Sequence, residues 1–171
     1  MATFIKISTI TVGSGGAASI DFTSIPATYT DLKVVLSTRA TGTSVSGWLY
    51  FNNDTAGSSY SDRTLEGSGT AASSGNRTGQ ARIVAVPLVP GTDRTANQFC
   101  STDIYIPNYL SSNYKSVSID STEDNNTTDS YADLVAGLWA NTSAITRVTI
   151  NISATNFAQY SSATLYGIKS S

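Results

Sequence analysis

The sequence predicts an all-β fold, an antiparallel β-sandwich of jelly-roll-like form with about ten short strands. Apolar and polar residues alternate with a period of two along most of the chain, which is the pattern of half-buried strands. No stretch has the 3.6-residue period of a long amphipathic helix. Segments rich in Gly, Ser, Asn, Asp and Pro recur at short spacing between the alternating stretches, as they do in sandwiches and barrels.

The expected strands follow one another along the whole chain. They cover residues 4–10, 19–22, 32–37, 46–53, 59–66, 81–89, 98–106, 114–121, 131–140, 148–152 and 163–169. The cleanest alternation is near the C-terminus, where Val148, Ile150 and Ile152 share one face. The abundance of Val, Ile, Thr and Tyr agrees with strands, since these residues fit a pleated, half-buried surface.

Length and composition indicate one domain over residues 1–171, with apolar residues at 40%, enough for a core. The longest irregular stretch, from Gly67 to Gly79, is rich in Gly, Ser and Ala. We interpret it as a surface loop and not as an interdomain linker, because the strand rhythm is the same on both sides. An immunoglobulin-like sandwich is the alternative fold, although its Cys…Trp…Cys spacing is absent.

The charge pattern argues against two classes of partner. The net charge is −2 and the ten basic residues are scattered, whereas nucleic-acid binding needs clustered Lys and Arg. No run approaches 18 apolar residues, so we expect no membrane span. The N-terminus lacks the zones of a signal peptide and alternates like a strand instead.

Catalytic signatures are missing, and we predict that the protein is not an enzyme. There is no histidine, which excludes a Ser-His-Asp triad and leaves Cys100 without a catalytic partner, so we expect Cys100 to be a buried apolar residue. Glu66 and Glu123 are the only glutamates, and no spacing pairs them for glycoside hydrolysis. We therefore assign no catalytic, cofactor-binding or metal-ligating residues.

One acidic segment, from Asp120 to Asp129, is the densest group of oxygen ligands and could serve calcium. It does not match the EF-hand pattern. The other interpretation is a solvated hairpin tip whose Asx turns satisfy its own backbone, and this is the one we favour.

Six aromatic residues are candidates for stacking on sugar rings. They are Trp48, Tyr50, Tyr60, Tyr109, Tyr114 and Trp139. In a two-sheet sandwich such residues belong more often to the core or to a subunit interface, and that is the placement we expect.

Several segments, taken in order, resemble a family of small phage virion structural proteins, the decoration, cement or fibre-type proteins of cyanophages and other marine phages. The segments are Phe4-Ile5-Lys6-Ile7, residues 11–18, residues 20–26, Leu49-Tyr50-Phe51-Asn52-Asn53-Asp54-Thr55, residues 103–109, residues 136–146 and the closing residues 156–169.

The resemblance implies a structural protein on the outer surface of the phage particle and transfers no site residues. A tail fibre generally needs an attachment segment and a stem, whereas this chain begins and ends with an expected strand. We therefore expect a capsid decoration protein that binds the major capsid protein and copies of itself as a homotrimer. The alternative is a tail-fibre or receptor-binding module that recognises host surface glycans, and a polysaccharide depolymerase is a further competitor.

Overall fold

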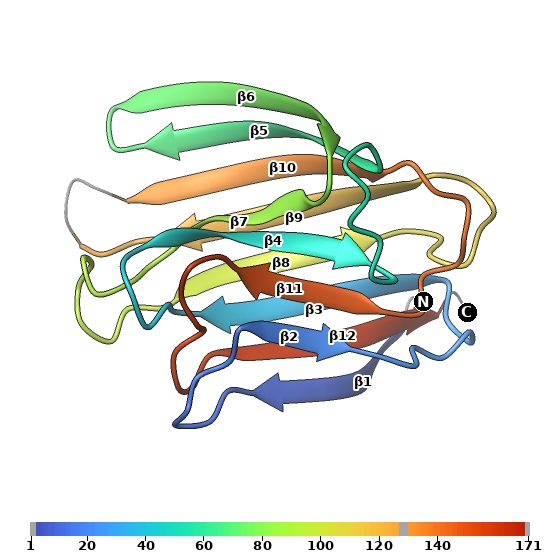
Figure 1. The fold of residues 1–171 in the computed structure, drawn as a ribbon, viewed down its shortest axis with the longest axis horizontal. Coiled ribbons are helices and arrows are strands. Elements are labelled where there is room, and N and C mark those ends of the chain that lie inside the picture. The colour runs from blue at the N-terminus through green and yellow to red at the C-terminus, as the bar shows by residue number, and fades with distance from the viewer. Residues whose placement is uncertain (1–2, 127–129, 170–171) are drawn as a thin grey trace.

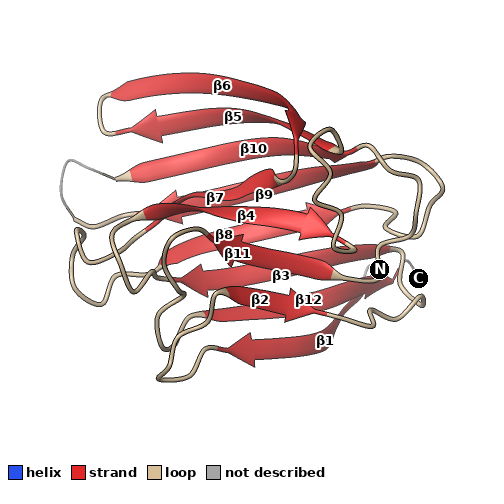
Figure 2. Cartoon of the chain, viewed as in Figure 1, coloured by secondary structure: helices blue, strands red, loops and turns tan. Residues whose placement is uncertain are grey.

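Two antiparallel sheets packed face to face make up the protein, as seen in a computed structural model (Figure 1) that describes residues 3–126 and 130–169. All regular elements of these residues are strands, which confirms the all-β prediction (Figure 2). The larger sheet has eight strands in the order β1-β12-β3-β8-β9-β10-β5-β6, and the smaller has four in the order β2-β11-β4-β7. The strands are β1 Thr3–Thr11, β2 Ser19–Phe22, β3 Asp31–Thr38, β4 Val45–Phe51, β5 Tyr60–Ser68, β6 Ala71–Gln80, β7 Ile83–Val89, β8 Cys100–Ile106, β9 Lys115–Glu123, β10 Tyr131–Trp139, β11 Val148–Ile152 and β12 Ser162–Lys169.

The strand order is that of a jelly roll with additions. Eight strands alternate between the sheets as β2-β11-β4-β7 and β3-β8-β5-β6, which is the two-sheet order of a double Greek key. The hairpin of β9 and β10 is inserted between β8 and β5 and widens the large sheet. β12 and β1 extend that sheet beyond β3, so the closing segment of the chain pairs inside the sandwich between β1 and β3.

Alternation along each strand supplies the core. Leu49 and Phe51 of β4 are buried, whereas Trp48 and Tyr50 on the other face are half-buried. On β9 every second residue from Lys115 to Glu123 is buried. Buried aliphatic side chains from both sheets meet between the layers, because removing apolar surface from water is the main favourable contribution to folding.

The stretch from Gly67 to Gly79 is the one place where the predicted organisation is wrong. It is not a loop, because β5 continues to Ser68 and β6 runs antiparallel beside it from Ala71. The turn between them uses Gly69 with a φ of 56°, a conformation that glycine adopts without strain. Most side chains of β6 are exposed, so the strand has no apolar alternation for a sequence pattern to detect.

The large sheet is wider than the small one. In Figure 1 the hairpin of β5 and β6 lies at one side of the molecule, beyond β7, the edge strand of the small sheet. We call this part, the β5–β6 hairpin that projects past β7, the overhang. The overhang is the part of the large sheet that extends beyond the edge of the second layer.

Candidate functional site

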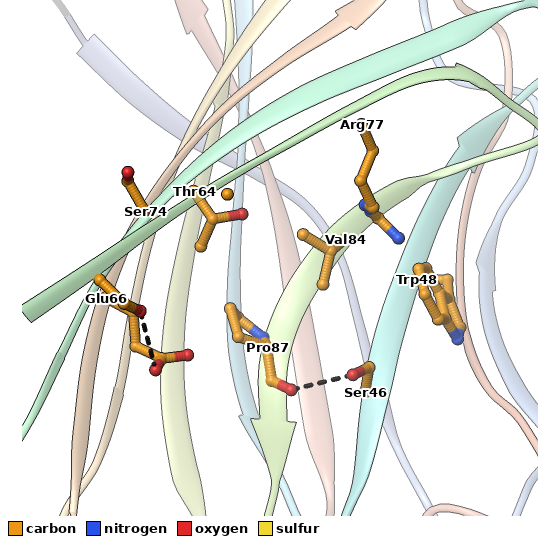
Figure 3. A pocket seen from close by; sticks show the side chains of 10 residues that line it. Ser46, Trp48, Thr64, Glu66, Ser74, Arg77, Val84 and Pro87 are labelled. Atoms are coloured by element: carbon orange, nitrogen blue, oxygen red, sulfur yellow. Dashed lines mark hydrogen bonds between the residues drawn. The ribbon is translucent and has the colours of Figure 1, made fainter.

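A groove lies on the inner face of the overhang, between β5–β6 and the β4–β7 edge of the small sheet. Its volume is about 310 Å³. Ten residues line it, mostly with small or polar side chains (Figure 3): Ser46, Trp48, Thr64, Glu66, Ser73, Ser74, Gly75, Arg77, Val84 and Pro87. Glu66 points into the groove, where it accepts a hydrogen bond from the Ser73 hydroxyl at 3.3 Å.

Arg77 is fixed on one side of this groove by a buried partner. Its Nε and Nη2 donate to the two carboxylate oxygens of Asp62 at 2.9 and 2.5 Å, and the amide of Val84 donates to the same carboxylate at 3.2 Å. The guanidinium groups of Arg77 and Arg82 lie 4.9 and 4.5 Å from the ring centre of Trp48. The ring of Trp48 is therefore engaged by cations within the chain, which leaves it poorly placed to stack on a sugar.

Two carboxylates of the inner face are neighbours. Glu66 of β5 is directly opposite Asp133 of β10 in the register, and Ser121 of β9 is opposite Asp133 on its other side. Asp133 is only 4% exposed, and its Oδ1 is buried without a hydrogen-bond partner. Burial, and after it the negative charge of Glu66, raises the pKa of Asp133 to about 6. Glu66 reaches the groove, whereas Asp133 lies under the second layer.

The outer face of the same region is apolar. Leu65 of β5 and Leu134 of β10 are directly opposite each other, and each is 55% exposed. Together with Gly67, Ala72 and Ala132 they form a shallow hollow of about 350 Å³, and the exposed Asp120, opposite Leu134 on β9, lines its far side. We call this the outer hollow. The two half-exposed leucines, with the small glycine and alanine residues beside them, make an apolar surface patch that water solvates poorly.

The aromatic candidates are mostly structural, as expected. Tyr60 and Trp139 are buried and stack on each other, and both rings pack at a tilt against Phe51, with ring centres 5.4 to 6.4 Å apart. Tyr109 is buried and donates its hydroxyl hydrogen bond to the carbonyl of Pro26.

The other three aromatic candidates reach the surface to different extents. Trp48 and Tyr50 are half-buried against the core. Tyr114 is 58% exposed beside a polar hollow that Asn108 and Asn113 also line.

The cysteine and glutamate candidates are also placed. Cys100 is buried, and its thiol forms a hydrogen bond with the hydroxyl of Thr38. Burial also raises the pKa of the thiol. The prediction that Cys100 is a core residue is therefore confirmed. Glu66 and Glu123 are not neighbours, because β10 lies between their strands. Glu123 is buried and accepts a hydrogen bond from the side-chain amide of Gln98.

The acidic segment divides between a strand and a turn. Asp120 and Glu123 belong to β9 and point to opposite faces, so they cannot share one ion. Asp124 accepts a hydrogen bond from the amide of Asn126 at 2.8 Å, which is the Asx turn expected of a hairpin tip. Residues 127–129 lie outside the described residues. Within the described part, no three His, Cys, Asp or Glu side chains gather as metal ligands, and no helix is long and apolar enough to span a membrane.

The sequence analysis missed three polar groups of the interior. Asp133, the Asp62–Arg77 pair and Lys115 all occupy inward positions of strands. A signal was present, since Lys115 alternates in phase with Val117 and Ile119, and Asp133 with Val135. Their partners come from strands distant in the sequence, and the pattern alone cannot supply those partners.

Comparison with known protein families and curated proteins finds no match to this chain. The resemblance to phage virion proteins therefore rests on the sequence segments quoted for it.

Proposed function

We propose that this protein is a non-enzymatic structural protein of a bacteriophage virion, a capsid decoration protein that binds the outside of the head and stabilises it. The observation that carries a binding role is the outer hollow. Leu65 and Leu134 are each 55% exposed and side by side, on a face that no other part of the described chain covers. Contiguous exposed apolar surface of this kind marks protein–protein contact.

The rest of the surface suits a particle component. Only 13% of residues are charged, and Ser and Thr are abundant. The exterior is therefore polar but does not carry a strong electrostatic potential. A sandwich whose core combines aliphatic side chains with buried aromatic rings is a rigid unit that can bridge neighbouring capsid subunits. Each added interface stabilises the assembled shell through mass action, because the protein binds the assembled state and not the separate subunits.

The interior carboxylates support a role without catalysis. Glycoside hydrolysis requires two carboxyl groups that both reach the substrate. Glu66 reaches the groove, but Asp133 beside it is 4% exposed, and Glu123 is 2% exposed. A buried acid under the second layer cannot protonate a leaving group in the groove, so we do not favour a polysaccharide depolymerase.

A receptor-binding module for host glycans is the second candidate. The observation that favours it is the exposed ring of Tyr114 beside a polar hollow of about 390 Å³ that Asn108, Ser111 and Asn113 also line. An open aromatic face next to amide and hydroxyl groups is the chemistry that binds a sugar. This candidate would be favoured if the protein binds host polysaccharide, if Tyr114→Ala abolishes that binding, and if the protein does not bind phage heads.

The copy number in purified particles tests the main proposal. Quantitative mass spectrometry should find hundreds of copies per particle, whereas a tail appendage would give roughly six to eighteen. Adding the purified protein to heads that lack it should raise the temperature at which they release DNA. Failure to bind such heads, or release of oligosaccharides from host polysaccharide, would overturn the proposal.

We also propose that the protein forms a homotrimer. A monomer mass in light scattering at micromolar concentration would contradict this.

A further inference from the structure

Of the four sheet edges, β6 has the longest stretch without protection against pairing, from Ala71 to Asn76. The opposite edge of the large sheet, β1, contains Lys6 and an irregularity between Lys6 and Ser8. In the small sheet, β2 has four residues, and β7 contains Pro87 and pairs irregularly with β4. Charges, proline, irregular pairing and short length are the devices that keep an edge from pairing with another chain.

β6 has few of these devices. It is ten residues long, and seven consecutive pairs with β5, from Arg77 opposite Asp62 to Ala71 opposite Ser68, are regular. The sequence from Ala71 to Asn76 contains Ala, Ser, Gly and Asn and no proline or lysine. The single charge in β6, that of Arg77, is bound to Asp62. The outer side of β6 therefore presents unpaired backbone N–H and C=O groups along a regularly paired stretch of strand.

The inner face beside this edge suits a cation. A strand added to β6 would lie about 10 Å from β5, because neighbouring strands are about 4.8 Å apart. On the inner face, the only side chain between such a strand and Glu66 is that of Ser73. A Lys or Arg side chain spans that distance. Glu66 has no cationic partner among the described residues, and the carboxyl of Asp133 lies behind it.

The outer face beside the same edge suits an apolar side chain. Ser74 and Ala72 are the outward residues of β6 opposite Leu65 and Gly67. These small side chains leave the outer hollow open toward the edge. A Leu or Ile on the outer face of an added strand would therefore lie beside Ser74 and extend toward Leu65, the nearer of the two leucines, since Leu134 on β10 is one strand further away.

We propose that β6 is a docking edge that accepts, by strand addition, an extended segment of another protein in which apolar side chains alternate with Lys or Arg. Backbone hydrogen bonds to β6 supply affinity, and the two faces read alternate side chains. The apolar residues contact the outer hollow and the basic residues contact Glu66. This inference rests on the proposed function in one respect, the use of the outer hollow for protein contact.

A synthetic peptide tests the docking edge in the full chain. The probe is a fluorescent nine-residue peptide in which Val alternates with Lys, with blocked ends. It should bind saturably in fluorescence anisotropy, and amide hydrogen exchange should slow in β6 and not in β1. The matched peptide with Glu in place of Lys should bind about tenfold more weakly, because it brings like charges to Glu66. A Val-Lys peptide methylated on its backbone nitrogens should not bind, since it cannot pair with β6.

Three protein variants separate the contacts. Glu66→Gln should weaken the Val-Lys peptide about fivefold and remove most of the preference over the Val-Glu peptide. Leu65→Ser should weaken both peptides about threefold, because Leu65 is the exposed apolar residue nearest to the added strand. Val35→Ser changes a comparable exposed residue of the same outer face, far from β6 on β3, and should leave both affinities unchanged. Circular dichroism and thermal unfolding check that each variant is folded.

The outcomes distinguish the two proposals. Equal binding of the Val-Lys and Val-Glu peptides, or protection of amides outside β6, would overturn the docking edge. So would a dimer in sedimentation experiments whose formation protects β6, because the occupant would then be a second copy. If heads bind the protein but the Val-Lys peptide does not bind it, the docking edge fails and the decoration role stands. If the peptide binds β6 but heads do not bind the protein, decoration fails and the docking edge stands.

Discussion

Glu66 and Asp133 face each other across the pairing of β5 with β10, on the inner side of the eight-stranded sheet. Only one of them meets the groove. Asp133 is buried with an unpartnered oxygen, so its charged form is disfavoured by lost hydration and by the neighbouring carboxylate. This arrangement makes the stability of the fold sensitive to mildly acidic pH.

The pKa of Asp133 predicts the sign of that dependence. Folding raises the pKa from 3.8 to about 6, so between these values the folded state binds more protons than the unfolded state. The contribution of Asp133 is therefore most favourable below pH 4 and is lost as the pH rises through 6. Asp133→Asn should raise the free energy of unfolding at pH 7 by on the order of 2 kcal/mol.

Denaturant unfolding of the wild type and Asp133→Asn at several pH values checks this. The difference between them should grow from pH 4 to pH 6.5 and then stay constant, because other carboxyl groups cancel in the comparison. Asp103→Asn, on the exposed outer face, serves as the control and should leave the pH profile unchanged. An Asp133→Asn variant that is less stable at pH 7 would contradict the prediction.

The Asp62–Arg77 pair should be important for folding. Asp62 is 2% exposed and depends on Arg77 for its charge partner. Arg77→Ala would leave a buried carboxylate without that partner, which costs about 3–5 kcal/mol. Lys33→Ala removes one side of the exposed Lys33–Asp103 pair and should cost less than about 1 kcal/mol. Chemical denaturation measures both, and equal losses would show that burial of Asp62 does not set the cost.

The buried lysine at the start of β9 should also contribute to the stability of the fold. Lys115 is 1% exposed, and its Nζ donates to the carbonyl oxygens of Asn113 and Ser143 at 2.6 and 2.9 Å. Lys115→Met keeps the apolar stem but removes these donors, so we expect a loss of about 2–3 kcal/mol. Hydrogen exchange should rise first at residues 141–145. A loss spread evenly over the molecule would argue against a local role in holding this loop.

Two glycines of the large sheet should respond in opposite ways. A Cβ at Gly167 of β12 would lie 2.2 Å from Cγ of Tyr29, so the ring packs flat on the glycine. Gly167→Ala must displace that ring and should lower stability by about 1–3 kcal/mol. Gly75 of β6 has nothing within 4 Å of a Cβ, so Gly75→Ala should be neutral or slightly stabilising. Thermal unfolding of both variants decides this, and a neutral Gly167→Ala would show that Tyr29 can move aside freely.

Alternation determined most of the strands and their faces from sequence alone. A period of two fixes which face of a strand a residue occupies, and it separates the buried Leu49 and Phe51 from Trp48 and Tyr50 on the other face. Phe157 in the loop before the last strand is buried, whereas Tyr160 in the same loop is 70% exposed. The sequence around the two aromatic residues does not distinguish them. Which of them is buried depends on the segments of the same chain that fold against this loop.

Tertiary structure decided everything that depends on partners distant in the sequence. β6 is a strand because β5 supplies its hydrogen bonds, although its Ala, Ser and Gly residues show no strand pattern. Asp133 has a raised pKa because the small sheet covers it and Glu66 is opposite. The sequence alone thus determined the all-β class and the inward faces, since these are local. The overhang, its free edge and its charges followed only from how the two sheets are stacked, because burial and proximity are properties of the folded chain.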